Sequence, residues 1–100
     1  MPRCKQKLQI TNRQGLHARP ASLFVQLANR FRSKILVRKG DEEVDGKSIM
    51  GLLMLALERG ATVELLTDGP DATEALEALA QFLTTNDEEP SGPRAVRGVS

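Results

Sequence analysis

Cysteine, histidine and large aromatic residues are scarce in this chain, and each shortage excludes a class of protein. The 100 residues include one Cys, one His and three Phe, but no Trp and no Tyr. The single thiol of Cys4 excludes an internal disulfide, and one Cys with one His excludes the usual structural zinc sites. No apolar run approaches the roughly 18 residues of a membrane span, and residues 1–10 lack the apolar block of a signal peptide. We therefore expect a cytoplasmic protein without metal or cofactor that does not insert into membranes.

The charge of the chain is nearly balanced but unevenly distributed. The formal net charge is +1, yet residues 1–40 contain ten Lys and Arg and no acid, whereas residues 41–83 contain two bases and ten acids. A basic half of this kind suits an anionic ligand, an acidic partner protein or nucleic acid, and it is equally compatible with a solvated surface that binds nothing. Nucleic acid is the weakest of these alternatives, because few aromatic rings are present to stack on bases. We therefore expect no nucleic acid among the partners.

Hydrophobic periodicity predicts an α+β domain. Apolar residues alternate in strand-like segments and recur every three or four residues in helix-like ones. The predicted strands cover residues 5–10, 34–38, 42–45 and 62–67, and the predicted helices cover residues 18–31, 48–57 and 71–83. The helices have one apolar stripe and the strands one apolar face, which favours a two-layer sandwich in the order β-α-β-β-α-β-α, with a mostly antiparallel sheet covered on one side. A ferredoxin-like unit with an additional helix is the alternative architecture.

The end of the chain differs in composition from the rest. From Thr84 onward Asn, Asp, Glu, Pro, Ser and Gly dominate, and Pro90 and Pro93 interrupt any regular structure. Few apolar residues are available to anchor this segment to a core. We therefore expect one domain over residues 1–84, followed by a disordered tail over residues 85–100.

Gly46, Lys47 and Ser48 match the last three positions of a phosphate-binding P-loop, but the rest of that motif is missing. The motif needs a glycine five residues before Gly46, where the chain has Asp41. The acidic residues between these positions would also repel a triphosphate. A serine hydrolase is excluded in the same way, because the chain has no Gly-x-Ser-x-Gly sequence.

The most informative segment is Gly15–Ala21, which places the only histidine at the start of a predicted helix. His17 lies at or next to the N-cap, where the unpaired N–H groups of the first turn and the helix dipole attract anions. Arg19 adds a guanidinium that can hold phosphate oxygens, and Pro20 suits a first helical turn. The dipole is also expected to lower the pKa of His17, so that an imidazole nitrogen stays nucleophilic near neutral pH. The pattern suits a histidine that accepts a phosphoryl group, and it also suits an inert histidine beside a solvated arginine.

Two separate motifs resemble one known family. The segment Gly15–Ala21 followed by Phe24 and Ala28, and the later segment Lys47–Leu52, have the spacing of the histidine-containing phosphocarrier (HPr) proteins of the bacterial phosphotransferase system. The resemblance covers about residues 4–84. It implies an open-faced β-sandwich in which a four-stranded antiparallel sheet is covered on one face by three helices.

The resemblance also implies a function. It identifies His17 as the phosphorylated histidine, which accepts the group from enzyme I and passes it to enzyme IIA-type domains. Arg19 corresponds to the arginine that contacts the phosphoryl group, and the helix amides at Ala18 and Arg19 would bind it. The chain would then be a phosphocarrier, a substrate of enzymes and not itself an enzyme. A non-phosphorylated regulatory binding module that uses the same surface is the alternative.

Further residues correspond to regulatory and docking positions of the family. Ser48 resembles the serine that HPr kinase/phosphorylase modifies in some members, but Ser is also a preferred N-cap that needs no regulator. The surface that contacts the partners corresponds to Ser22, Ile49, Met50 and Leu53. Helical spacing alone equally allows two of these, Met50 and Leu53, to be core residues. Residues 86–100 are an extension that typical members lack.

Overall fold

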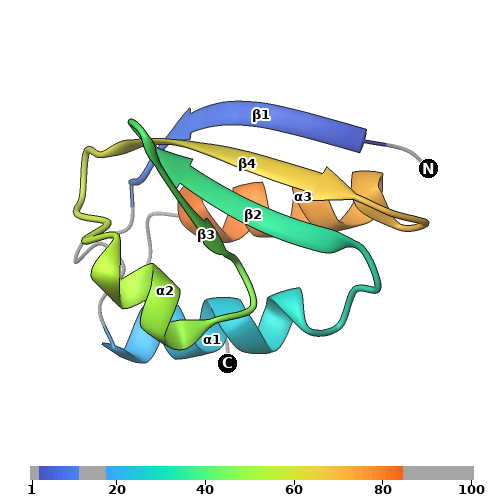
Figure 1. Ribbon diagram of the computed structural model, residues 1–100, viewed down its shortest axis with the longest axis horizontal. Helices are drawn as coiled ribbons and strands as arrows, with labels where there is room; N and C mark the ends of the chain where they lie inside the picture. Colours follow the sequence, from blue (N-terminus) through green and yellow to red (C-terminus); the bar gives the residue numbers. More distant parts are fainter. Residues whose placement is uncertain (1–2, 12–17, 85–100) are drawn as a thin grey trace, which may run out of the picture.

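The computed structural model describes residues 3–11 and 18–84, with the backbone alone at residues 18 and 19. Four strands and three helices follow one another along these residues (Figure 1). They are β1 (Arg3–Gln9), α1 (Ala18–Ala28), β2 (Lys34–Lys39), β3 (Glu42–Asp45), α2 (Ile49–Met54), β4 (Thr62–Asp68) and α3 (Ala72–Thr84). The order β-α-β-β-α-β-α is the one that periodicity predicts. The tail that we expect to be disordered, residues 85–100, lies outside the described residues.

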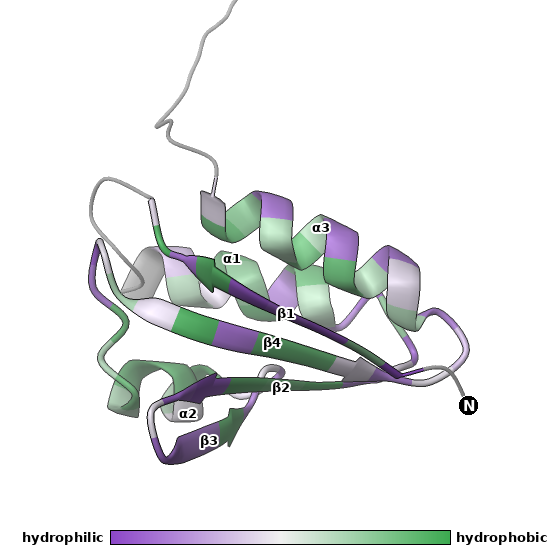
Figure 2. Cartoon of the chain, turned by 90° about the horizontal axis from the view of Figure 1, so that it is seen from above, coloured by the Kyte–Doolittle hydropathy of each residue, from purple (hydrophilic) through white to green (hydrophobic). Residues whose placement is uncertain are grey.

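The strands form one sheet in the order β1-β4-β2-β3, so that β4 lies between β1 and β2. β2 and β3 form an antiparallel hairpin. All three pairings are antiparallel. β1 lies at the edge of the sheet beside β4 alone, whereas a ferredoxin-like unit places its first strand inside the sheet beside its third, so the ferredoxin-like alternative is wrong. The three helices cover one face of the sheet and leave the other open (Figures 1 and 2). This is the open-faced sandwich that the resemblance implies.

The core lies between the sheet and the helices. Alternation along β4 turns Val63, Leu65 and Thr67 toward the helices. The apolar stripe of α3 turns toward the sheet and buries Ala72, Ala75, Leu79 and Leu83. The ring of Phe24 in α1 meets that of Phe82 in α3 edge to face, with centroids 5.9 Å apart. Packing of both layers around these side chains therefore places α1 and α3 side by side under the sheet.

Two helices are shorter than the sequence predicts. α1 ends at Ala28, three residues early, because the N–H groups of Arg30 and Phe31 bond to carbonyls only three residues back. α2 ends at Met54 instead of residue 57, because Ala56 has a φ of +54°, in the left-handed region that an α-helix cannot use. Phe31 is consequently only half-buried, where the longer helix would have buried it.

A partly buried polar contact joins the loop between α1 and β2 to the start of α3. Ser33 is fully buried, and its hydroxyl donates to Asp71 Oδ1 at 2.6 Å. The same carboxylate accepts the backbone N–H groups of Arg32 and Ser33, each at 2.9 Å. These hydrogen bonds, led by that of the Ser33 side chain, hold the pKa of Asp71 below its usual value. Gly69 is required beside them, because a Cβ there would lie 2.6 Å from Ser33 Oγ.

Candidate functional site

The first turn of α1 directly follows His17 in the chain. α1 begins at Ala18, so that Ala18, Arg19 and Pro20 occupy its first three positions. Pro20 fits there because the N–H groups of a first turn have no acceptor within the helix. The turn contains no acidic residue, so no side chain of α1 itself neutralises the positive end of its dipole. His17 and the side chain of Arg19 lie outside the described residues, and their roles stay predictions.

Large apolar side chains are exposed on α1 and α2, which pack against each other beside the sheet (Figure 1). We call these five residues the α1–α2 apolar surface: Leu23, Ile49, Met50, Leu53 and Met54. Met50 and Leu53 are 67% and 38% exposed, so the alternative that they belong to the core is wrong. Exposed apolar side chains that gather on neighbouring elements are typical of docking surfaces.

The sequence identifies part of this surface and misses part of it. Ile49, Met50 and Leu53 are exposed on α2, while Ser22 on α1 is half-buried. The sequence-based prediction did not include Leu23 and Met54 in this exposed surface. Each is an apolar residue that falls outside the buried stripe of its helix, and that position is the signal that identifies an exposed apolar side chain. The buried stripes consist of Ala21, Phe24, Val25 and Ala28 in α1, and of Leu52 followed by Leu55 at α2.

Ser48 is the N-cap of α2. Its backbone is extended, with φ of −117° and ψ of 114°, and its Oγ accepts the N–H of Gly51 at 3.0 Å. This is the capping geometry predicted for Ser48 as a structural residue. The side chain is half-buried. The hydrogen bond uses Oγ as an acceptor and leaves the hydroxyl proton unused, so capping and modification by a kinase are compatible roles.

Two lysines from outside α2 hold this six-residue helix at its ends. Lys47 Nζ donates to the carbonyl of Phe31 at 2.8 Å and ties the segment before Ser48 to the turn that follows α1. Lys39 Nζ of β2 donates to the carbonyls of Ala56 at 3.0 Å and Leu55 at 3.4 Å. α2 has no basic residue in its own last turn, so Lys39 supplies the positive charge that a helix C-terminus favours. The sequence predicts neither contact, because the partners are 16 or 17 residues apart in the chain.

The described residues contain no group of three or more His, Cys, Asp or Glu side chains placed to hold a metal ion. Within the same residues, no helix has both the length and the apolar character needed to cross a membrane.

Known proteins resemble this chain over almost its whole described length. The family model for the PTS HPr component phosphorylation site, where PTS is the phosphotransferase system, matches residues 4–85. Phosphocarrier protein HPr of Neisseria meningitidis serogroup A is 49% identical over 79 residues, which cover 79% of this chain and 89% of that protein. The HPr-like protein Crh of Halalkalibacterium halodurans is 48% identical over 79 residues, which cover 79% of this chain and 94% of that protein.

A solved structure agrees with the fold. The crystal structure of phosphocarrier protein HPr from Bacillus anthracis strain Ames matches with a TM-score of 0.80 and 45% sequence identity, covering 82% of this chain and 98% of that one. The matched region of the family model includes both motifs on which the resemblance rests, Gly15–Ala21 and Lys47–Leu52. The chain therefore belongs to the HPr family of phosphocarrier proteins of the phosphotransferase system.

Proposed function

We propose that this protein carries a phosphoryl group on His17, accepting it from enzyme I and passing it to enzyme IIA-type domains. The observation that carries the proposal is the placement of an exposed apolar surface on α1 and α2, the first of which begins directly after His17. A carrier needs a reactive group beside a surface that successive partners can bind. Enzymes would supply the rest of the chemistry, so the carrier is their substrate. We expect it to work in the cytoplasm.

Transfer would proceed at an imidazole nitrogen of His17. The lone pair of that nitrogen attacks phosphorus, an N–P bond forms, and the bond from phosphorus to the donor breaks. The free N–H groups at the start of α1, at Ala18 and Arg19, and the Arg19 guanidinium are the groups that would stabilise the phosphoryl oxygens. Transfer chemistry of this kind depends mainly on positioning and charge neutralisation.

Replacing Arg19 by Lys keeps the charge but loses the planar fork of the guanidinium, so phosphoryl transfer should slow without stopping.

Docking of both partners would use Ile49, Met50 and Leu53, with Ser22 at the edge on α1. Exposed apolar side chains of this size are effective anchors when a partner excludes water from them. The basic amino-terminal half would favour partners with acidic surfaces and speed their association.

Phosphorylation of Ser48 by an HPr kinase/phosphorylase would regulate this docking. A phosphate adds about −1.5 to −2 charges at neutral pH, directly before Ile49 and Met50 in the chain. The N-terminal end of α2 tolerates the added charge, so the helix should remain folded. The expected consequence is weaker docking of an acidic partner without loss of the fold.

A regulatory module that is never phosphorylated on His17 is the second candidate. This chain is about as similar to an HPr-like protein Crh, at 48% identity, as to a phosphocarrier protein HPr, at 49%, so similarity alone does not exclude this candidate. The presence of His17 in this chain favours the carrier.

Intact-mass analysis after incubation with phosphoenolpyruvate and enzyme I distinguishes the two candidates. We expect one acid-labile phosphate on the wild-type protein and none on His17→Ala, whose thermal melt should match the wild type. An unmodified wild-type protein would favour the regulatory module. A His17→Ala protein that still gains the phosphate would overturn the assignment of the site.

A further inference from the structure

The face of the sheet that the helices leave open carries a regular pattern of charge. Nine residues on three neighbouring strands alternate with the buried ones and so point away from the core. We call them the open sheet face: Arg3, Lys5 and Lys7 of β1, Glu64, Leu66 and Asp68 of β4, and Lys34, Leu36 and Arg38 of β2. The described helices all lie on the other side of the sheet (Figure 1).

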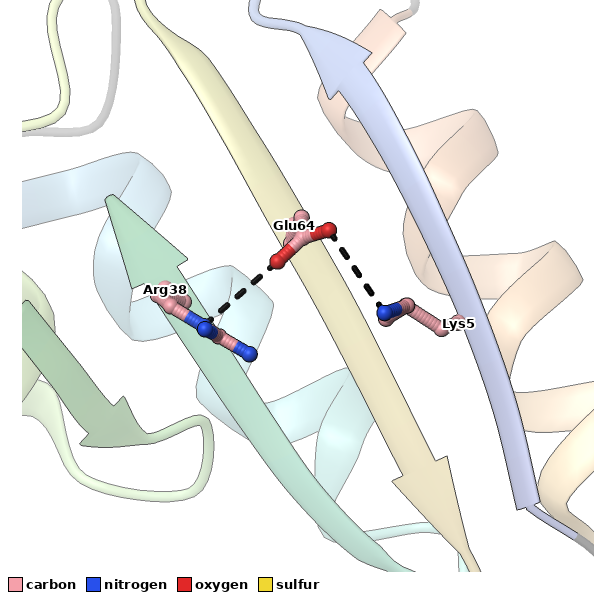
Figure 3. A network of polar contacts seen from close by, with 3 residues as sticks. All are labelled: Lys5, Arg38 and Glu64. Carbon is pink, nitrogen blue, oxygen red and sulfur yellow. Dashed lines mark ion pairs between the residues drawn. The ribbon is translucent and has the colours of Figure 1, made fainter. Parts of the chain in front are cut away.

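Each carboxylate of the open sheet face lies between cations of two other strands. Figure 3 shows Glu64 with Arg38 on one side and Lys5 on the other, at 3.4 Å from Arg38 Nε to Oε1 and 4.0 Å from Lys5 Nζ to Oε2. Within the described residues Arg38 Nε forms no hydrogen bond, so its contact with Glu64 is one of charge alone. Arg3 forms a similar ion pair, with Nε 3.8 Å from Asp68 Oδ2.

The cations outnumber the carboxylates. The open sheet face contains five Lys and Arg against two acids, and in the part of the chain that the structure describes Lys7 and Lys34 have no ion-pair partner. On β3, Glu43 and Asp45 are opposite Arg38 and Leu36 and turn to the same side of the sheet, so the positive excess is limited to β1, β4 and the start of β2. Side chains this exposed stay hydrated and can exchange partners at little cost.

An apolar spot lies within this positive surface. Leu36 and Leu66 are opposite each other on β2 and β4, and both are half-buried. They line an open hollow of about 470 Å³, whose lining also includes four cations, Arg3, Lys5, Lys34 and Arg38, and one carboxylate, Asp68. A hollow lined by apolar atoms and an excess of cations fits an apolar side chain between two acidic ones.

We propose that the open sheet face binds an acidic peptide segment of a partner protein, with one apolar side chain of that segment over Leu36 and Leu66. The carboxylates of the peptide on either side of that apolar side chain would pair with Lys5 of β1 and Lys34 of β2, the two strands that flank Leu66 on β4. This surface lies on the side of the sheet away from the α1–α2 apolar surface, so it can bind a second partner independently of phosphoryl transfer.

Other occupants fit the open sheet face less well. A nucleic acid has no apolar side chain to place over Leu36 and Leu66, and no aromatic side chain of the described residues lies on this face to stack on a base. A layer of anionic lipid headgroups likewise presents charge but no apolar side chain to Leu36 and Leu66. A second copy placed face to face would bring like charges together.

The test uses the full, isotope-labelled chain and the capped peptide Glu-Glu-Leu-Glu-Glu, followed by NMR amide shifts. We expect shifts confined to β1, β2 and β4, with a dissociation constant below about 1 mM. Lys34→Glu should weaken binding at least tenfold and Lys34→Gln less, while Arg59→Glu, a matched charge reversal in the exposed loop before β4, should leave affinity unchanged. His17→Ala should bind the peptide like the wild type, which separates this result from the proposed transfer function.

Control ligands decide what the surface recognises. Gln-Gln-Leu-Gln-Gln should not bind, and Glu-Glu-Ala-Glu-Glu should bind several-fold more weakly than the leucine peptide. The proposal is overturned by the absence of shifts in β1, β2 and β4, by an equal loss of affinity in Arg59→Glu, or by an oligonucleotide of equal charge that binds as tightly.

Discussion

α2 and α3 reach stable positions by different means. α3 has thirteen residues and buries four of them in the core, so its own apolar stripe positions it. α2 has six residues and buries one, Leu52, and its ends depend on the Ser48 cap and on Lys39 and Lys47. An isolated helix of that length is not stable in water.

The difference shows how the protein keeps an apolar helix face exposed. If α2 were positioned by burying its apolar side chains, Ile49, Met50 and Leu53 would not be available to partners. Polar contacts at its two ends hold the helix while these side chains remain exposed. The variants below test this distinction between the two helices.

Leu79→Ala should cause the largest loss of stability. Leu79 is fully buried in α3, and truncation of a buried leucine costs about 2–5 kcal/mol through lost burial and the cavity left behind. Chemical denaturation measures the change. The exposed Leu53→Ala in α2 is the matched control and should change the free energy of unfolding little. A similar loss in both would show that α2 is positioned by burial after all.

Loss of the Asp71 contact should cause the second-largest loss of stability, and the size of that loss should depend on pH. The folded-state pKa of Asp71 is lowered, so its contribution is present above the ordinary aspartate pKa of about 4 and is lost as pH falls through the lower folded value. Asp71→Asn should therefore be less stable than the wild type at pH 7, with the difference shrinking below pH 4. Denaturation at a series of pH values measures it, and a difference that does not change with pH would contradict the role of the carboxylate charge.

Ser48 variants should separate the stability of α2 from its regulation. Ser48→Ala loses the cap and should destabilise the protein by about 1 kcal/mol while still accepting phosphate. Ser48→Asp retains a good cap and should melt like the wild type, but it places a negative charge next to the docking side chains and should accept phosphate more slowly. Melting and transfer rates are measured for both variants. A wild-type rate in Ser48→Asp would leave Ser48 as a helix cap alone.

Lys39→Met should have the smallest effect, about 0.5 kcal/mol, because its hydrogen bonds to the end of α2 are partly exposed to solvent. Hydrogen exchange of the α2 amides should speed up more than that of α3. Lys39→Arg should restore the slower exchange, and Lys34→Met, on the same strand but without a described hydrogen-bond partner, is the control. Equal acceleration in both methionine variants would show that Lys39 does not hold the helix.

Local patterns predict most of the fold. The alternation of β4 and the stripe of α3 depend on residues that are two to four positions apart, so the sequence shows them directly. The same is true of Ser48 as the cap of α2 and of Pro20 in the first turn of α1. Helix ends are predicted less well. The left-handed φ that ends α2 occurs at Ala56, and the sequence has no glycine at that position to indicate it.

The candidate site divides in the same way. The sequence by itself determined the single histidine before a helix, the capping serine after Lys47, and the excess of bases in residues 1–40. Only the tertiary structure decided that Lys39 reaches the end of α2, that Ser33 meets Asp71 across 38 residues of chain, and that five of the bases share one face of the sheet. These contacts depend on strand order and register, which follow from the packing of the whole core and not from any short segment of the chain.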